Sequence, residues 1–78
     1  MQQQFIMYLK EQTGIDFKID PYFSEIKTHR GQKYFNLDLG ERVWNSRKYL
    51  TLERLSETHK TFTVEPNGIE RIAIFLKG

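Results

Sequence analysis

The segment TFTVEPNGIERIAIFLKG, residues 61–78, decides the fold of this chain. It predicts a strand over residues 61–65, a turn at Pro66-Asn67-Gly68, and a second strand over residues 69–76. Proline presets φ for the second position of a turn, asparagine suits the third position, and glycine takes the left-handed position that follows. We therefore predict a β-hairpin at this end of the chain.

The apolar pattern selects the register of this hairpin. A three-residue loop places Phe62 opposite Ile72 and gathers five apolar side chains on one face: Phe62, Val64, Ile72, Ile74 and Leu76. The rival two-residue loop, Asn67-Gly68, would need an amide hydrogen that Pro66 lacks, and it would divide the apolar residues between faces. The last strand is apolar on both sides near its end, which predicts a central position in the sheet. Ile69, Ala73 and Phe75 are then expected on the exposed face.

Length and composition restrict the class of protein. Seventy-eight residues indicate a single domain, residues 1–78, with a small core. The chain has no cysteine, so neither a disulfide nor a thiolate metal site is expected. No apolar stretch reaches the length of a membrane span, and the short run at residues 5–9 is no secretory signal. We expect a cytoplasmic protein.

The first half of the chain predicts one helix and three strands. Phe5, Ile6, Leu9 and Thr13 recur with helical spacing, so residues 2–13 are predicted to form a helix that ends at Gly14. Residues 15–20 alternate as a half-buried strand, which either ends at Pro21 or lies at the edge of the sheet. Residues 22–39 predict a second hairpin, in which Ile26 pairs with Phe35 across a two- or four-residue loop around residues 29–32.

The middle of the chain is harder to interpret. Residues 40–50 lack a clear period and are expected to be a connection. Residues 52–60 predict a helix capped by Thr51, with Glu53 near its start and His59 at its end. A strand at residues 49–53 is the competing interpretation. Together these elements predict an α+β fold, in which two short helices pack on one face of an antiparallel sheet of four or five hairpin-built strands, in the order α-β-β-β-α-β-β.

The sequence contains no recognisable catalytic motif. His29 and His59 are thirty residues apart, unlike the closely spaced ligands of local metal sites. No nucleophile motif and no glycine-rich phosphate-binding fingerprint occurs. We therefore expect no catalytic residue, no metal and no cofactor.

The remaining signal is a basic and aromatic stretch. Residues 26–60 hold eight Lys or Arg and four Asp or Glu, whereas the rest of the chain holds four and six. Cations contact phosphates and exposed rings stack on bases, so this stretch is a candidate nucleic-acid surface. The candidate residues are His29, Arg30, Lys33, Arg42, Trp44, Arg47, Lys48 and Tyr49. In the competing interpretation Trp44 and Tyr49 belong to the core.

These observations predict a small non-enzymatic domain that acts by binding. A protein-interaction or oligomerising module is the first hypothesis, because a thin core is often completed by a partner or a second copy. A nucleic-acid-binding domain that uses residues 42–49 is the alternative. No membrane partner is expected.

Overall fold

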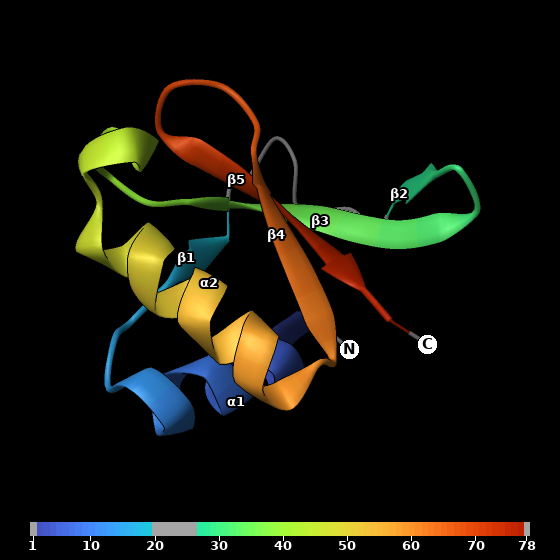
Figure 1. Cartoon of the computed structure of the whole chain (residues 1–78), viewed down its shortest axis with the longest axis horizontal. Helices are drawn as coiled ribbons and strands as arrows, with labels where there is room; N and C mark the ends of the chain where they lie inside the picture. Colours follow the sequence, from blue (N-terminus) through green and yellow to red (C-terminus); the bar gives the residue numbers. More distant parts are fainter. Residues whose placement is uncertain (1, 20–26, 78) are drawn as a thin grey trace.

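The computed structural model describes residues 2–19 and 27–77, and it confirms the predicted α+β fold (Figure 1). The elements follow the predicted order, with one added 3₁₀ helix, η1. They are α1 (Gln2–Thr13), β1 (Lys18–Ile19), β2 (Lys27–His29), β3 (Gln32–Asp38), η1 (Val43–Asn45), α2 (Arg47–His59), β4 (Phe62–Pro66) and β5 (Arg71–Leu76). Neither α-helix in the described part of the chain is long and apolar enough to span a bilayer.

The five strands form one antiparallel sheet in the order β1-β3-β5-β4, with β2 also paired to β3. β1 pairs with the end of β3 and β2 pairs with its beginning, so both lie along the same side of this strand. β5 lies between β3 and β4, which confirms the predicted central position of the last strand.

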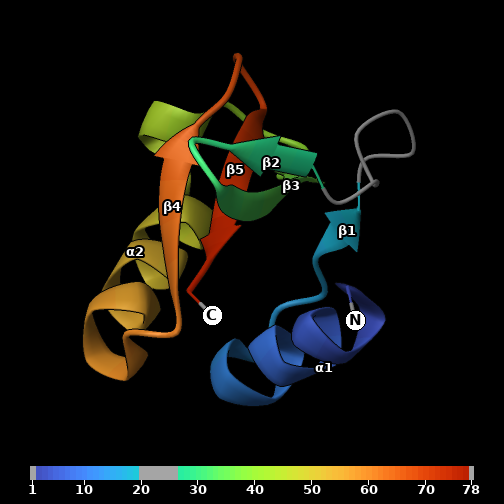
Figure 2. The ribbon, with the colours of Figure 1, turned by 90° about the vertical axis from the view of Figure 1, so that its right-hand side faces the viewer.

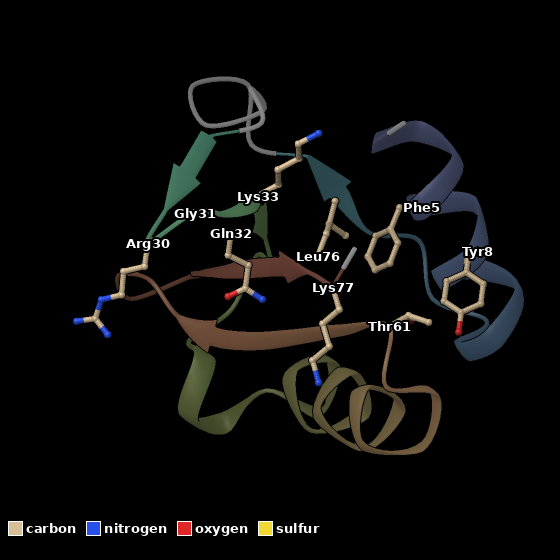
Figure 3. Close-up of a pocket in the computed structure, with 9 residues that line it drawn as sticks. All are labelled: Phe5, Tyr8, Arg30, Gly31, Gln32, Lys33, Thr61, Leu76 and Lys77. Atoms are coloured by element: carbon tan, nitrogen blue, oxygen red, sulfur yellow. The ribbon is translucent and has the colours of Figure 1, made fainter.

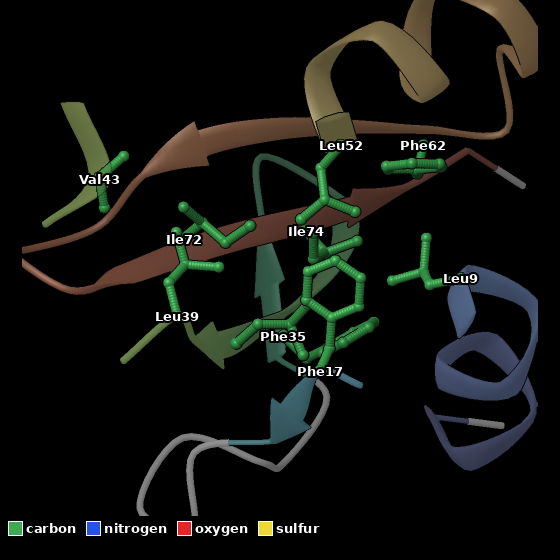
Figure 4. Packing of buried hydrophobic residues seen from close by; sticks show 10 residues of the cluster. Leu9, Phe17, Phe35, Leu39, Val43, Leu52, Phe62, Ile72 and Ile74 are labelled. Atoms are coloured by element: carbon green, nitrogen blue, oxygen red, sulfur yellow. The ribbon is translucent and has the colours of Figure 1, made fainter. Parts of the chain in front are cut away.

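Both helices lie against one face of this sheet (Figure 2). Leu9 of α1 and Leu52 of α2 are fully buried against the sheet residues Phe35, Phe62 and Ile74. Figure 4 shows these side chains converging between the helices and the strands. The five apolar residues predicted to share a face of the C-terminal hairpin all belong to this core or pack against it.

The helix α1 has the predicted bounds. Leu9 is buried and Phe5 and Ile6 are half-buried, so the predicted apolar face is the face that packs. Gly14 has φ +73° and donates its N–H to the Lys10 carbonyl at 2.7 Å. This left-handed residue ends the helix as its sequence predicted.

The hairpin β2–β3 has the predicted register and the shorter of the two predicted loops. Lys27 pairs with Tyr34 and His29 pairs with Gln32, which continues the predicted pairing of Ile26 with Phe35. Arg30 and Gly31 form the two-residue turn with φ of 55° and 79°, as a type I′ turn requires. The first part of this predicted hairpin, residues 22–26, and the predicted strand end at residues 20–21 lie outside the described residues.

The predicted register of the C-terminal hairpin is wrong by four residues, because Phe62 pairs with Leu76 rather than with Ile72. Side chains alternate with period two, so an even shift keeps every residue on its predicted face. The cause lies outside the hairpin. The carbonyls of Ile69 and Glu70 accept hydrogen bonds from Val43 and Leu39, so these two residues are unavailable to β4.

The observed register also gives the longer ladder. β4 pairs along its whole length with β5, and the N–H of Lys77 continues the pairing to the Thr61 carbonyl at 3.0 Å. In the predicted register the last residues of β5 would have faced residues 58–61, of which Thr58 and His59 belong to α2. The three-residue loop and its two-residue rival are both excluded.

The second helix begins five residues earlier than predicted, at Arg47, and the competing strand at residues 49–53 is wrong. Ser46, not Thr51, is the N-cap, and its side chain accepts a hydrogen bond from the Tyr49 N–H at 3.2 Å. Thr51 lies inside the helix and donates to the Arg47 carbonyl. The helix ends at His59, with Lys60 in the left-handed conformation.

The sheet face opposite the helices differs from expectation. Ile69 is 58% exposed, but Ala73 and Phe75 are buried, at 5% and 9% exposure. The ring of Phe75 stacks on Tyr34 at 5.2 Å, and the His29 ring lies 6.4 Å away. The prediction that Ala73 and Phe75 are exposed is therefore wrong. The hairpin β2–β3 brings the rings of His29 and Tyr34 onto the same face of the sheet.

A partly buried polar contact joins this face to the β4–β5 loop. Asn36 of β3 is 2% exposed, and its side-chain oxygen accepts a hydrogen bond from the Asn67 amide at 2.6 Å. The residues are far apart in sequence, and no sequence pattern predicted their contact.

Candidate binding surfaces

The structure divides the candidate nucleic-acid residues into two groups at opposite ends of the longest axis (Figure 1). One group follows β3, in and around η1 and the first turn of α2. Its members are Arg42, Trp44, Arg47, Lys48 and Tyr49. The other group surrounds the β2–β3 turn and comprises His29, Arg30 and Lys33. A single continuous surface does not contain all eight residues.

The segment that carries Trp44 is firmly attached to the fold. The Leu39 N–H donates to the Glu70 carbonyl at 2.8 Å, and the Val43 N–H donates to the Ile69 carbonyl at 2.9 Å. The Val43 side chain is only 3% exposed and belongs to the core. Trp44 is therefore displayed from a backbone that is anchored immediately before it.

Ser46 fixes the other side of this segment. It is 1% exposed, and its hydroxyl donates to Glu41 Oε1 at 2.7 Å while it caps α2. One buried hydroxyl thus connects the loop before η1 to the helix after it. A hydroxyl can donate one hydrogen bond and accept another, so both contacts are satisfied together.

Trp44 itself is exposed. Its relative exposure is 64%, and the Arg42 guanidinium carbon lies 5.4 Å from the ring centroid, a cation–π distance. The interpretation of Trp44 as a core residue is therefore wrong. We call the exposed group formed by Arg42, Trp44 and Ile69 the Trp44 surface, because the backbone bond from Val43 to Ile69 holds its two segments side by side.

Lys48 and Tyr49 have structural contacts. Lys48 Nζ donates to the Leu39 carbonyl at 3.1 Å. Tyr49 is half-buried against the core. Burial raises the pKa of its hydroxyl, and the nearby carboxylates of Glu53 and then Glu65 raise this pKa further. The Tyr49 hydroxyl therefore faces negative charge.

The charges close to the Trp44 surface are mixed in sign. Glu41 directly precedes Arg42, and Glu70 directly follows Ile69. Arg47 is exposed at the start of α2. Glu41 and Glu70 thus lie among the cations Arg42, Arg47 and Lys48, so this end carries charges of both signs.

The second group of candidate residues borders an open groove (Figure 3). Arg30 and Lys33 line it, whereas His29 packs near Tyr34 and Phe75 on the face away from the helices. The groove is lined by Phe5, Tyr8, Arg30, Gly31, Gln32, Lys33, Thr61, Leu76 and Lys77.

Of the nine lining residues, sequence reasoning predicted only Arg30 and Lys33 as site residues. Among those it missed are Phe5, Tyr8 and Lys77. They come from the two ends of the chain, so no local motif contains them. The one available signal was Lys77, a cation directly after the last strand.

The described residues contain no group of three His, Cys, Asp or Glu side chains arranged to hold a metal ion. Comparisons of the chain with protein-family models, with curated proteins and with solved structures found no match. The two exposed surfaces are therefore the features that indicate a function.

Proposed function

We propose that this protein is a small non-enzymatic interaction module of the cytoplasm, and that two copies associate through the Trp44 surface. The observation that carries this proposal is the 64% exposure of Trp44 on a segment whose neighbours Val43 and Ser46 are buried. The absence of cysteine accords with a reducing compartment.

The residue types favour a protein contact. Tryptophan and arginine are enriched among the residues that dominate binding energy at protein interfaces. Association also requires that side chains and loops lose conformational freedom, and a prearranged segment loses less. The hydrogen bonds of Val43 and Ser46 already hold this segment.

The charge pattern favours a second copy as the partner. In a two-fold symmetric contact, the same surface patch meets itself in the opposite orientation. A patch that carries both Arg42 and Glu70 can place each guanidinium against the carboxylate of the other copy. A surface of one sign would repel its copy.

Trp44 provides a direct test because it is the chain's only tryptophan. We expect its fluorescence emission to shift to shorter wavelength as the protein concentration rises, because a dimer contact removes the ring from water. Sedimentation equilibrium on the same samples should show the mass of two chains at high concentration.

Trp44→Ala and Ile69→Ser should each abolish the dimer in sedimentation. Leu50→Ser is the matched control, because Leu50 is 50% exposed on α2 and lies outside the Trp44 surface. A strictly monomeric mass at millimolar concentration would refute self-association, and an equal loss in the control would refute the choice of surface.

Nucleic-acid binding through residues 42–49 is the second candidate, and the exposed Trp44 ring supports it because an open aromatic face can stack on a base. Titration with a single-stranded oligonucleotide at low salt tests it. Quenching of Trp44 emission that disappears with added salt would favour this candidate over self-association.

A further inference from the structure

The groove opens where two neighbouring strands diverge. The ladder between β3 and β5 ends at Tyr34 and Phe75. The next residues in the two strands, Lys33 and Leu76, both line the groove. Lys33 still pairs with Thr28 of β2, but on its other side no described strand continues the ladder.

The floor and one wall of the groove are apolar. Leu76 is half-buried, the Phe5 ring lies beside it, and Tyr8 lines the groove farther along α1 (Figure 3). Edge-on contacts hold the Phe5 ring, at 5.7 Å from Phe35 and 5.1 Å from Phe62. A side chain that entered the groove would therefore meet a fixed hydrophobic surface.

The rest of the groove is positive. Its lining includes the cations Arg30, Lys33 and Lys77 but neither Asp nor Glu. Within the described part of the chain, none of these three charged groups forms a salt bridge. Lys33 and Lys77 extend to opposite sides of the row formed by Gln32 and Leu76 (Figure 3).

The turn holds Arg30 in an uncommon conformation. Arg30 has φ +55°, in the left-handed region, where asparagine or glycine is normally preferred in such a turn. A left-handed conformation is unfavourable for a residue with a side chain. Arg30 therefore occupies this turn position at the edge of the groove although its backbone disfavours the left-handed conformation.

We propose that this groove binds an extended acidic peptide segment that inserts one apolar side chain. The cations on both sides complement carboxylates distributed along a strand, and the apolar floor accepts the inserted side chain. Beside Lys33, where the ladder to β5 has ended, the start of β3 offers backbone groups to an extended chain, as in strand addition.

The same features favour a peptide over a single-stranded nucleic acid. Bases need an open aromatic face. Phe5 is half-buried, and its ring contacts the rings of Tyr8, Phe35 and Phe62. Tyr8 is also half-buried and lies edge-on to His59, and Leu76 is aliphatic. This proposal concerns the end of the molecule opposite the Trp44 surface, so the two can fail independently.

The test uses the whole chain and three fluorescein-labelled peptides of equal length, measured by fluorescence anisotropy. The first alternates glutamate with leucine, the second replaces leucine by serine, and the third replaces glutamate by lysine. We expect the first to bind at low salt, the second to bind at least tenfold more weakly, and the third not to bind.

A double variant locates the site. Lys33→Gln with Lys77→Gln should weaken binding of the glutamate–leucine peptide about tenfold, since both charges face the ligand. Arg47→Gln with Arg54→Gln is the control, because it removes the same charge from α2 and should leave affinity within about twofold. Lys33 lies in β3, and Arg47 and Arg54 lie in α2, whereas Lys77 directly follows β5. None of these four side chains is buried.

Three results would overturn the proposal: no binding of the glutamate–leucine peptide at low salt, equal binding of the serine peptide, or equal losses in the two double variants. A single-stranded oligonucleotide that binds more tightly than the peptide, and that the groove variant weakens, would assign the groove to nucleic acid instead.

Discussion

The two ends of this molecule contain similar residues but present different surfaces. At the Trp44 end, backbone hydrogen bonds and the Ser46 cap hold the segment, and carboxylates lie beside the cations. At the groove end, a two-residue turn and packed rings hold the walls, and the lining cations have no carboxylate among them. Charge counted over a long segment of sequence therefore does not show which cations have carboxylates beside them.

The largest effect should come from the leucines that attach each helix to the sheet. Leu52 of α2 and Leu9 of α1 are both fully buried. Leu52→Ala or Leu9→Ala should lower the free energy of unfolding by about 2–5 kcal/mol, measured by urea denaturation. Native-state hydrogen exchange should accelerate mainly in the helix that carries the substitution. Equal acceleration in both helices would show that the two ends are not independent.

Ser46→Ala should have the next largest effect, at the Trp44 end. The change removes the cap of α2 and the partner of Glu41, so we expect a loss of about 1–2 kcal/mol. The fluorescence anisotropy of Trp44 should also fall, because its segment loses one attachment. Thr51→Ala is the control and should cost much less, since Thr51 bonds only within the helix. Equal losses of stability in the two variants would show that Ser46 contributes no more to the start of α2 than Thr51 does.

Gly31→Ala is the corresponding change at the groove end. Gly31 has φ +79°, and an added Cβ would meet no atom within 4 Å, so the cost should be conformational, about 1–2 kcal/mol. Arg30→Asn should stabilise the same turn while it weakens acidic-peptide binding. Thermal unfolding and the anisotropy assay would measure the two effects. A turn that Arg30→Asn destabilises would contradict this account of the hairpin.

Alkaline pH should act on the Trp44 end through Tyr49. Because the pKa of Tyr49 is raised in the folded protein, the fold favours the protonated hydroxyl. Its contribution to stability is therefore complete below the ordinary pKa of about 10 and is lost as pH rises through the raised pKa. Urea denaturation between neutral pH and pH ~11 should show this decline, and Tyr49→Phe should reduce it. An unchanged slope in Tyr49→Phe would exclude Tyr49 as its origin.

The smallest effect should come from the salt bridge between Lys10 and Asp16, 2.8 Å long with side chains 62% and 81% exposed. Water screens exposed pairs, so Asp16→Asn should leave the denaturation midpoint unchanged within error. The hydrogen bond and charge of Asp16 raise the pKa of Lys10, so any contribution is present below pH 10.5 and disappears at higher pH. A measurable loss at neutral pH would show that this pair helps to position α1.

Local sequence determined the elements and their faces. The spacing of Phe5 and Leu9 and the left-handed Gly14 specified α1, and alternation along residues 62–76 specified which side chains are buried, even though the register was wrong. The weaker signals failed for a physical reason. Ser46 and Thr51 are both good caps by residue type, and only the hydrogen bond to Glu41 and the anchoring of Val43 favour Ser46.

Only the tertiary structure decided the register of the last hairpin, the exposure of Trp44 and the composition of the groove. Each depends on contacts between segments distant in sequence: Val43 with Ile69, Asn36 with Asn67, and α1 with the end of β5. The hydrogen-bond partners and the burial of a residue depend on every segment that packs against it. A local pattern therefore specifies which face a residue takes, and the assembled sheet specifies its neighbours.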